Sequence, residues 1–175
     1  MSIAESYIAE FEQEASITRR FLERVPNEKL AWKPHERSMS AGQLALHLAM
    51  VPAAVMEMAP ADTFPVPDFT APNPQPETLS EVLRTFESSI AKVREVLLQL
   101  DDGKMQGLCR GVKDGRDLMT MPRAAFVRML LFSHWVQHRG QLGVYLRLLG
   151  QKVPSSYGPS ADEIPDFLKA PVATV

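Results

Sequence analysis

Cysteine is almost absent from this sequence: Cys109 is the only one among 175 residues. A single cysteine excludes an intrachain disulfide and a metal cluster held by several thiolates. Cys109 lies between Leu108 and Arg110 in a glycine-rich loop. We expect an inert thiol there rather than a catalytic one.

The sequence also lacks runs of lysine or arginine, and its formal net charge is -2. It therefore offers no electrostatic surface for nucleic acid or for an anionic membrane. The N-terminal segment is acidic, and every long apolar segment carries charges or histidines within 18 residues. We expect a cytoplasmic protein that acts on a small molecule, with neither nucleic acid nor membrane as a partner.

Apolar residues make up 45% of the chain and recur with helical spacing in four segments. This pattern predicts helices over residues 2–25, 40–58, 78–100 and 120–149. Two of them begin with the form of a capping box, Ser40-Ala-Gly-Gln43 and Thr78-Leu-Ser-Glu81. Thr120 and Pro122 fit the start of the last helix, and Gly150 fits its end.

The connections between these segments are of two kinds. Six prolines from Pro60 to Pro76, both included, indicate an extended crossover that is long enough to travel the length of a helix. Residues 101–121 are rich in glycine, and a short hairpin around Asp114-Gly115 is compatible with this loop. The expected fold is a single all-α domain over residues 1–175: a four-helix bundle with one long Pro-rich crossover and room for a hairpin before the fourth helix.

Two histidines of the fourth helix, His134 and His138, are four residues apart. On a helix they differ by roughly 40° in azimuth, so both can reach one point. The same face carries an apolar stripe, and we expect it to face the interior; it consists of Val127, Leu130, Leu131, Gln141, Tyr145, Leu148 and Leu149. Interior imidazoles need partners for their ring nitrogens. A divalent metal ion is the simplest partner for both.

A third histidine, His47, shares an apolar face of the second helix with Leu44 and Val51. Pro52 lies in the same helix and removes the hydrogen bond that the carbonyl of Leu48 would accept. Together with His134 and His138, His47 would supply three neutral nitrogens, a ligand number typical of an open, catalytic site. Imidazole ligands favour zinc or nickel over calcium or magnesium, and iron or manganese stays open.

Other kinds of metal site do not fit these residues. A zincin needs Glu directly after its first histidine, where this chain has Trp135. A di-iron carboxylate bundle needs Glu three residues before an inward histidine, where this chain has Leu131 before His134. His35 follows a proline in a charged loop, and we expect it to be solvated. The centre therefore lacks an obvious general base of its own.

Two glycines inside the fourth helix, Gly140 and Gly143, each cost about 1 kcal/mol relative to Ala, so a reason for them is needed. They lie on the face opposite the histidines, together with Met129, Phe132 and Val136. We interpret this face as one that packs closely against another helix, from the same chain or from a second copy. A homodimer is the expected assembly.

Three stretches of the chain together resemble the DinB/YfiT-like superfamily of damage-inducible helical bundles. They are Trp32 to Leu48, His134-Trp-Val-Gln-His-Arg-Gly-Gln-Leu142, and Gly150 followed by Pro154 and Tyr157-Gly-Pro-Ser-Ala-Asp-Glu163. The resemblance spans nearly the whole chain. It implies a three-histidine metal site at His47, His134 and His138.

The resemblance also implies chemistry. Characterised members look like metal-dependent transferases or isomerases that use low-molecular-weight thiols such as bacillithiol, mycothiol or glutathione. We therefore expect a metal-dependent thiol transferase, in which Gln141 and Tyr145 contact the ligand or support the metal ligands. Two alternatives stay open: a hydrolase that uses metal-bound hydroxide, and a metal-binding stress-response protein without turnover.

Overall fold

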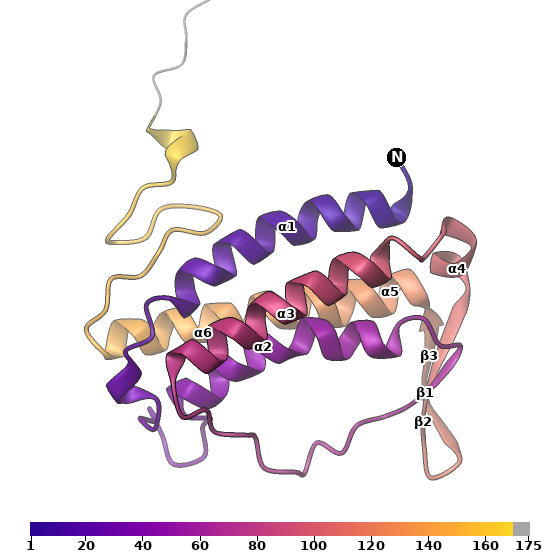
Figure 1. Cartoon of the computed structure of the whole chain (residues 1–175), viewed down its shortest axis with the longest axis horizontal. Helices are drawn as coiled ribbons and strands as arrows, with labels where there is room; N and C mark the ends of the chain where they lie inside the picture. Colours follow the sequence, from indigo (N-terminus) through magenta and orange to yellow (C-terminus); the bar gives the residue numbers. More distant parts are fainter. Residues whose placement is uncertain (170–175) are drawn as a thin grey trace, which may run out of the picture.

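The computed structural model describes residues 1–169, which form a bundle of long helices (Figure 1). The bundle contains α1 (Ile3–Leu22), α2 (Ala41–Met58), α3 (Leu79–Leu97) and α6 (His134–Leu148), which is preceded by α5 (Arg123–Val127) and by the π-helical stretch η2 (Arg128–Ser133). Both α1 and α2 pack against α3 and α6. Shorter helices are η1 (Asn27–Lys29), α4 (Asp102–Gln106) and η3 (Asp166–Leu168). The expected single domain includes residues 170–175, which lie outside the described residues.

The helix starts follow the capping pattern of the sequence in most cases. The hydroxyl of Ser40 accepts from Gln43 N, and the Gln43 side chain accepts from Ser40 N, so the predicted capping box is present. Thr78 caps α3 through Glu81 N, but the Glu81 carboxylate accepts from Glu77 N instead of returning to Thr78. That capping box is therefore only half formed.

The ends of the last helical segment differ from each other in how well they were predicted. Thr120 lies in a strand, and Pro122 occupies the N-cap of α5 without a side-chain hydrogen bond, so the predicted cap was wrong. At the other end, Gly150 follows α6 with a φ of 72°, a conformation in which glycine carries no Cβ penalty. The predicted C-terminal stop is confirmed.

A small sheet makes the all-α expectation too simple. Strand β2 (Leu108–Lys113) pairs antiparallel with β3 (Arg116–Pro122), and β1 (Thr63–Pro65), inside the crossover, pairs parallel with β2. The hairpin turns at Asp114 and Gly115, whose φ values of 51° and 73° match the type I′ geometry that hairpins favour. The hairpin that the sequence allowed is present, and the parallel strand was not predicted.

The crossover runs from β1 back along the bundle to the start of α3, so α2 and α3 point the same way (Figure 1). Its length thus serves the purpose expected from the sequence, because a tight turn would have made these two helices antiparallel. Gln75 fastens its end to the start of α2, where its side chain accepts from Ser40 Oγ at 2.6 Å and donates to the carbonyl of Leu30 at 3.2 Å. The crossover is therefore held against one end of α2.

The buried face of α6 is not the face that carries the histidines, which corrects the expected inward stripe. The buried residues of α6 are Trp135, Arg139, Leu142, Gly143 and Leu146. Within the predicted stripe, Gln141 and Leu148 are exposed, while Val127 and Leu131 are buried. Leu131 lies within the π-helical η2, and Gln141 and Leu148 follow it. Because η2 holds more residues per turn, a regular helical projection through it assigns the wrong faces. The histidines are half-buried at the edge of the core.

The glycine face of α6 is covered in part by α1 of the same chain. A Cβ on Gly143 would lie 3.1 Å from Cε1 of Phe21, and Phe132 packs edge-on against Tyr7 at 5.3 Å between ring centroids. Gly140 has open space around it. Close helix packing is thus confirmed for Gly143, and it is intramolecular. The homodimer stays a prediction.

Helix α2 is the most apolar helix of the bundle. It is the one described helix long and apolar enough to cross a membrane, with a mean hydropathy of 1.2, but 56% of it is buried inside the protein. Burial against α3 and α6 marks it as the core helix of the bundle, not as a membrane span. The cytoplasmic location stays a prediction.

Candidate metal centre

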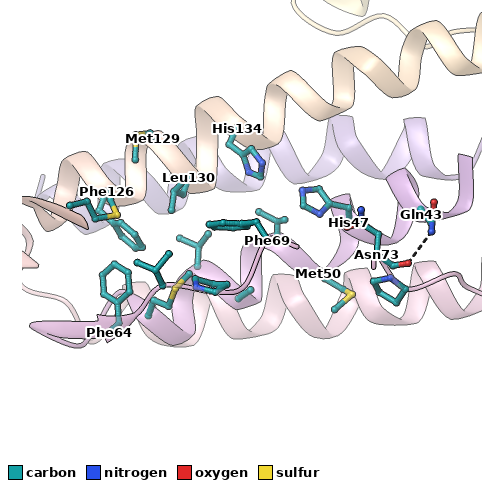
Figure 2. Close-up of a pocket in the computed structure, with 18 residues that line it drawn as sticks. Gln43, His47, Met50, Phe64, Phe69, Asn73, Phe126, Met129, Leu130 and His134 are labelled. Atoms are coloured by element: carbon teal, nitrogen blue, oxygen red, sulfur yellow. Dashed lines mark hydrogen bonds between the residues drawn. The ribbon is translucent and has the colours of Figure 1, made fainter. Parts of the chain in front are cut away.

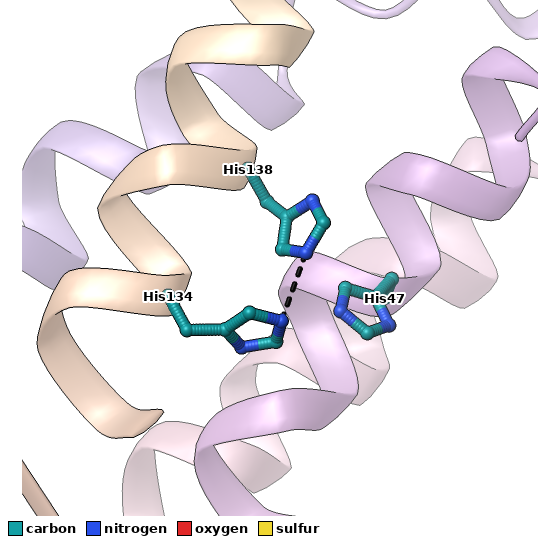
Figure 3. A group of neighbouring side chains, drawn as sticks. All are labelled: His47, His134 and His138. Atoms are coloured by element: carbon teal, nitrogen blue, oxygen red, sulfur yellow. Dashed lines mark hydrogen bonds between the residues drawn. The ribbon is translucent and has the colours of Figure 1, made fainter. Parts of the chain in front are cut away.

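Three imidazoles from two helices converge at one point between α2 and α6 (Figure 3). His47 comes from α2, and His134 and His138 come from successive turns of α6. One ring nitrogen from each lies within 4.8 Å of the other two, and Nε2 of His134 and Nε2 of His138 are 2.9 Å apart. The structure therefore brings together the three histidines predicted from the sequence.

The two helices are fastened together beside the histidines. Because Pro52 has no N–H, the carbonyl of Leu48 lacks its helical donor. The indole Nε1 of Trp135 donates to that carbonyl at 2.8 Å, inside the core. Trp135 follows His134, and Leu48 follows His47, so this single bond fixes the register between the two helix segments that carry the histidines.

A buried ion pair fixes α6 from its other side. Arg139 Nη1 lies 2.6 Å from Oε2 of Glu14 on α1, and both side chains are buried. Arg139 also donates to Thr18 Oγ1 at 3.1 Å and to the hydroxyl of Tyr157 at 2.7 Å. This ion pair lies on a face of α6 other than that of His138, and it limits rotation of α6 about its axis.

The imidazole nitrogens have few partners within the protein. Gln141 Oε1 lies 2.7 Å from Nδ1 of His138, which is consistent with a proton on Nδ1 and a free lone pair on Nε2. Nε2 of His47 and Nδ1 of His134 are buried without any hydrogen-bond partner. Buried polar atoms are rarely left unpaired, so these two require an explanation.

Tyr145, the other predicted contact residue, is turned toward the loop before α2. Its hydroxyl donates to the carbonyl of Met39 at 3.2 Å, and its ring meets Trp32 edge-on at 5.6 Å. The hydrogen bond of Gln141 places that side chain directly against a histidine. For both residues, contact with a ligand stays a prediction.

The surroundings favour the neutral form of His47 and His134. Burial, together with the neighbouring rings of His138 and His134, lowers the pKa of His47 to about 4. Burial and His138 also lower the pKa of His134, while the backbone of Leu130 acts in the opposite direction. Only a neutral imidazole has a lone pair for a metal ion.

These residues fit a divalent transition metal ion. Ligands held about 2.0–2.1 Å from a tetrahedral ion lie roughly 3.3 Å from one another, so the spacing of the three nitrogens needs only small side-chain rotations. A bound ion would also give Nε2 of His47 the partner it lacks. Three nitrogen ligands without a fourth protein ligand leave a coordination position open.

A cavity of about 500 Å³ opens beside the centre and is bordered by His47 and His134 (Figure 2). It extends along α2 to Phe64 of β1 and Phe126 of α5, whose rings meet at 4.9 Å. Nearly all of its lining is apolar. Among the described residues that line it, the polar side chains are Gln43, His47, Asn73 and His134, and none is a carboxylate.

The cavity was not predicted from the sequence, because its walls come from separate elements: α2, the crossover, β3, α5, η2 and α6. The related signal in the sequence is its methionine content. Four of the nine methionines line the cavity, namely Met50, Met58, Met119 and Met129. Methionine is frequent at surfaces that adapt to apolar ligands.

The two residues set aside in the sequence lie away from the centre. His35 is in an exposed turn, where its Nδ1 accepts from Arg37 N at 3.2 Å. Cys109 is buried in strand β2 and not in the loop expected from the sequence, and burial raises the pKa of its thiol. Both features agree with the predicted solvated histidine and inert thiol.

The chain matches a known protein family over most of its length. The model of the DinB family matches residues 1–166. The chain belongs to the DinB family. This DinB protein is 26% identical over 174 residues to YrdA of Bacillus subtilis strain 168, which is described as uncharacterized. The match covers 94% of this chain and 95% of YrdA.

Solved structures show the same fold. A DinB-like protein from Bacillus cereus ATCC 10987 superposes with a TM-score of 0.70 at 21% identity, covering 87% of this chain and 97% of the other. The DinB-like protein YjoA from Bacillus subtilis superposes with a TM-score of 0.66 at 19% identity, covering 85% and 95%. At these identities the likeness concerns the fold alone.

Proposed function

We propose that this DinB protein is a metal-dependent enzyme that transfers a low-molecular-weight thiol to an electrophile at His47, His134 and His138. One observation carries the proposal: three imidazoles converge, with buried nitrogens unpaired, at the border of an apolar cavity. A structural site would be closed by a fourth protein ligand, and the described residues place none within this group. Zinc or nickel suits the donor set best, and iron or manganese is compatible with it.

The reaction joins the thiol sulfur to a carbon of the electrophile, and the leaving group departs with the electrons of the broken bond. A divalent ion bound at the three imidazoles would favour the thiolate form of a thiol that reached its open position. The proton of the thiol passes to solvent. The nucleophile thus belongs to the cosubstrate, and the chain needs no nucleophilic side chain of its own.

The residues of this chain would bind and orient the reactants. Gln141 holds the ring of His138 through Nδ1 and directs Nε2 toward the centre. The Trp135 bond to Leu48 keeps α2 and α6 in register. The cavity next to His47 and His134 would take the apolar part of the electrophile and exclude water from it.

The lining of the cavity favours thiol transfer over hydrolysis. A hydrolase of this kind benefits from a general base beside the water that attacks, and no carboxylate lines the described cavity. A thiol has an ordinary pKa near 8.5 and bulk water one of about 15.7, so a thiol needs a much smaller lowering of its pKa by the metal ion than water does. Thiol chemistry therefore makes the smaller demand on this site.

The test pairs the metal-loaded protein with a panel of cellular thiols and with haloalkyl or epoxide electrophiles. We expect thioether formation that requires both thiol and metal and is lost in His138→Ala but kept in His35→Ala, a matched exposed histidine. Consumption of the electrophile without thiol would identify a hydrolase instead. Retained metal with neither reaction would identify a metal-binding stress-response protein.

A further inference from the structure

The cavity beside the metal centre has the size and the chemistry of a binding site for a small apolar group. Its volume of about 500 Å³ lies in the range of sites for small organic ligands. Its polar residues lie at the end near the histidines, and the arm toward Phe64 and Phe126 is lined by apolar side chains (Figure 2). A ligand in this arm would gain from burial and would find no charged partner.

The walls of the cavity are adaptable. Met50, Met58, Met119 and Met129 line it from α2, β3 and η2. Methionine has three rotatable bonds and a polarisable sulfur, so it can repack around ligands of different shape. Such walls fit a family of apolar groups rather than one rigid molecule.

Phe69, in the crossover, is a large aromatic side chain that stays mostly exposed at the cavity. This ring lines the cavity (Figure 2), yet 83% of the residue is exposed. A large aromatic side chain is usually buried, and a ligand in the apolar arm would cover part of it. A ligand in the apolar arm would therefore give this exposed ring an apolar partner.

We propose that this cavity selects the electrophile by an uncharged alkyl or aryl group, which lies between the methionines and Phe69 while its reactive carbon points toward His47 and His134. The inference rests on the proposed thiol transfer for its chemistry, but the binding step can be measured without that chemistry. The selected class is an apolar electrophile with a flexible or aromatic tail, and acidic or cationic tails are disfavoured.

The test measures binding in protein stripped of metal, so it does not depend on turnover. A neutral fluorescent probe, N-phenyl-1-naphthylamine, is displaced by primary alcohols from butanol to decanol. Burial of each added methylene should tighten binding about fourfold until the cavity is full. The Phe69→Ala variant should bind octanol roughly tenfold more weakly, since it loses a partly covered aromatic contact.

The matched control is Leu98→Ala, which removes another exposed apolar side chain, 75% exposed and outside the cavity lining. This variant should bind octanol as the wild type does. An affinity that does not change with the chain length of the alcohol would overturn the proposal. So would an equal loss of octanol affinity in Phe69→Ala and Leu98→Ala. Binding of octylammonium or octanoate as tight as that of octanol would also overturn it.

The same variants separate this inference from the proposed function. If alcohols bind as expected but no thioether forms with any thiol, the proposed function fails and the cavity assignment stands. If thioether forms equally well from methyl and octyl electrophiles, the proposed function stands and the selectivity inference fails.

Discussion

Replacing Trp135 by Phe should show how strongly the two histidine-bearing helices depend on one hydrogen bond. Trp135 Nε1 donates to the carbonyl of Leu48, a fully buried residue, at 2.8 Å. Phenylalanine keeps an aromatic ring against Phe11, which stacks on Trp135 at 5.4 Å, but it leaves that carbonyl without a donor. An unsatisfied buried acceptor costs about 1–3 kcal/mol, and the lost ring volume adds on the order of 1 kcal/mol.

Pro52 offers a way to isolate the hydrogen-bond part of that cost. In a Pro52→Ala background, the new N–H at position 52 can donate to Leu48 as in a regular helix. The penalty of Trp135→Phe should then fall by about 1–3 kcal/mol, because only the packing loss is left. The two substitutions are therefore predicted to be strongly non-additive.

Urea unfolding of the four proteins of this cycle measures the effect. With a typical slope near 2 kcal/mol per molar urea, a coupling of 2 kcal/mol separates the expected and additive midpoints by about 1 M. Additivity to within about 0.5 kcal/mol would refute the reasoning, since the indole would then not be replacing the helical bond that Pro52 removes.

Two further predictions concern pH and the glycines of α6. Burial and the neighbouring imidazoles lower the pKa of His47 to about 4, against about 6.5 in the unfolded chain. The unfolded metal-free chain therefore binds more protons between these values, and the free energy of unfolding should fall as pH drops from about 6.5 to about 4. Denaturant titrations at several pH values should show that the free energy of unfolding falls less steeply with pH in His47→Asn than in the wild type, and as steeply in His35→Asn. The same pH dependence in all three proteins would contradict the lowered pKa of His47. Gly140→Ala, which has open space, should stabilise by up to about 1 kcal/mol, whereas Gly143→Ala, 3.1 Å from Phe21, should not; equal shifts in melting temperature would contradict the packing described.

The parts of the fold that could be predicted are those encoded locally. The Ser40 cap, the Gly150 stop and the spacing of His134 and His138 are patterns within four residues or at a single position. His47 could be added because its face was apolar and because two other imidazoles already needed a partner. The convergence of the three side chains follows from such local information combined with the bundle architecture.

The parts that could not be predicted depend on contacts between distant segments. β1 has only three residues and ends in Pro65, so it is too short for an alternating pattern of apolar residues to predict it. It is defined by its pairing with β2, which lies more than forty residues later in the chain. The π-helical turn of η2 has no clear marker in the sequence, yet it rotates the faces of the last helix. The cavity is likewise assembled from separate elements.

Elemental analysis of the purified protein tests the central claim most directly, because it counts the metal ions and identifies them. The three-histidine centre predicts about one transition metal ion per chain in the wild type and in His35→Ala, and a sharp loss in His47→Ala and His138→Ala, with circular dichroism showing that the variants stay helical. Unchanged metal content in the His47 and His138 variants, or a wild type that takes up no metal at neutral pH, would contradict it.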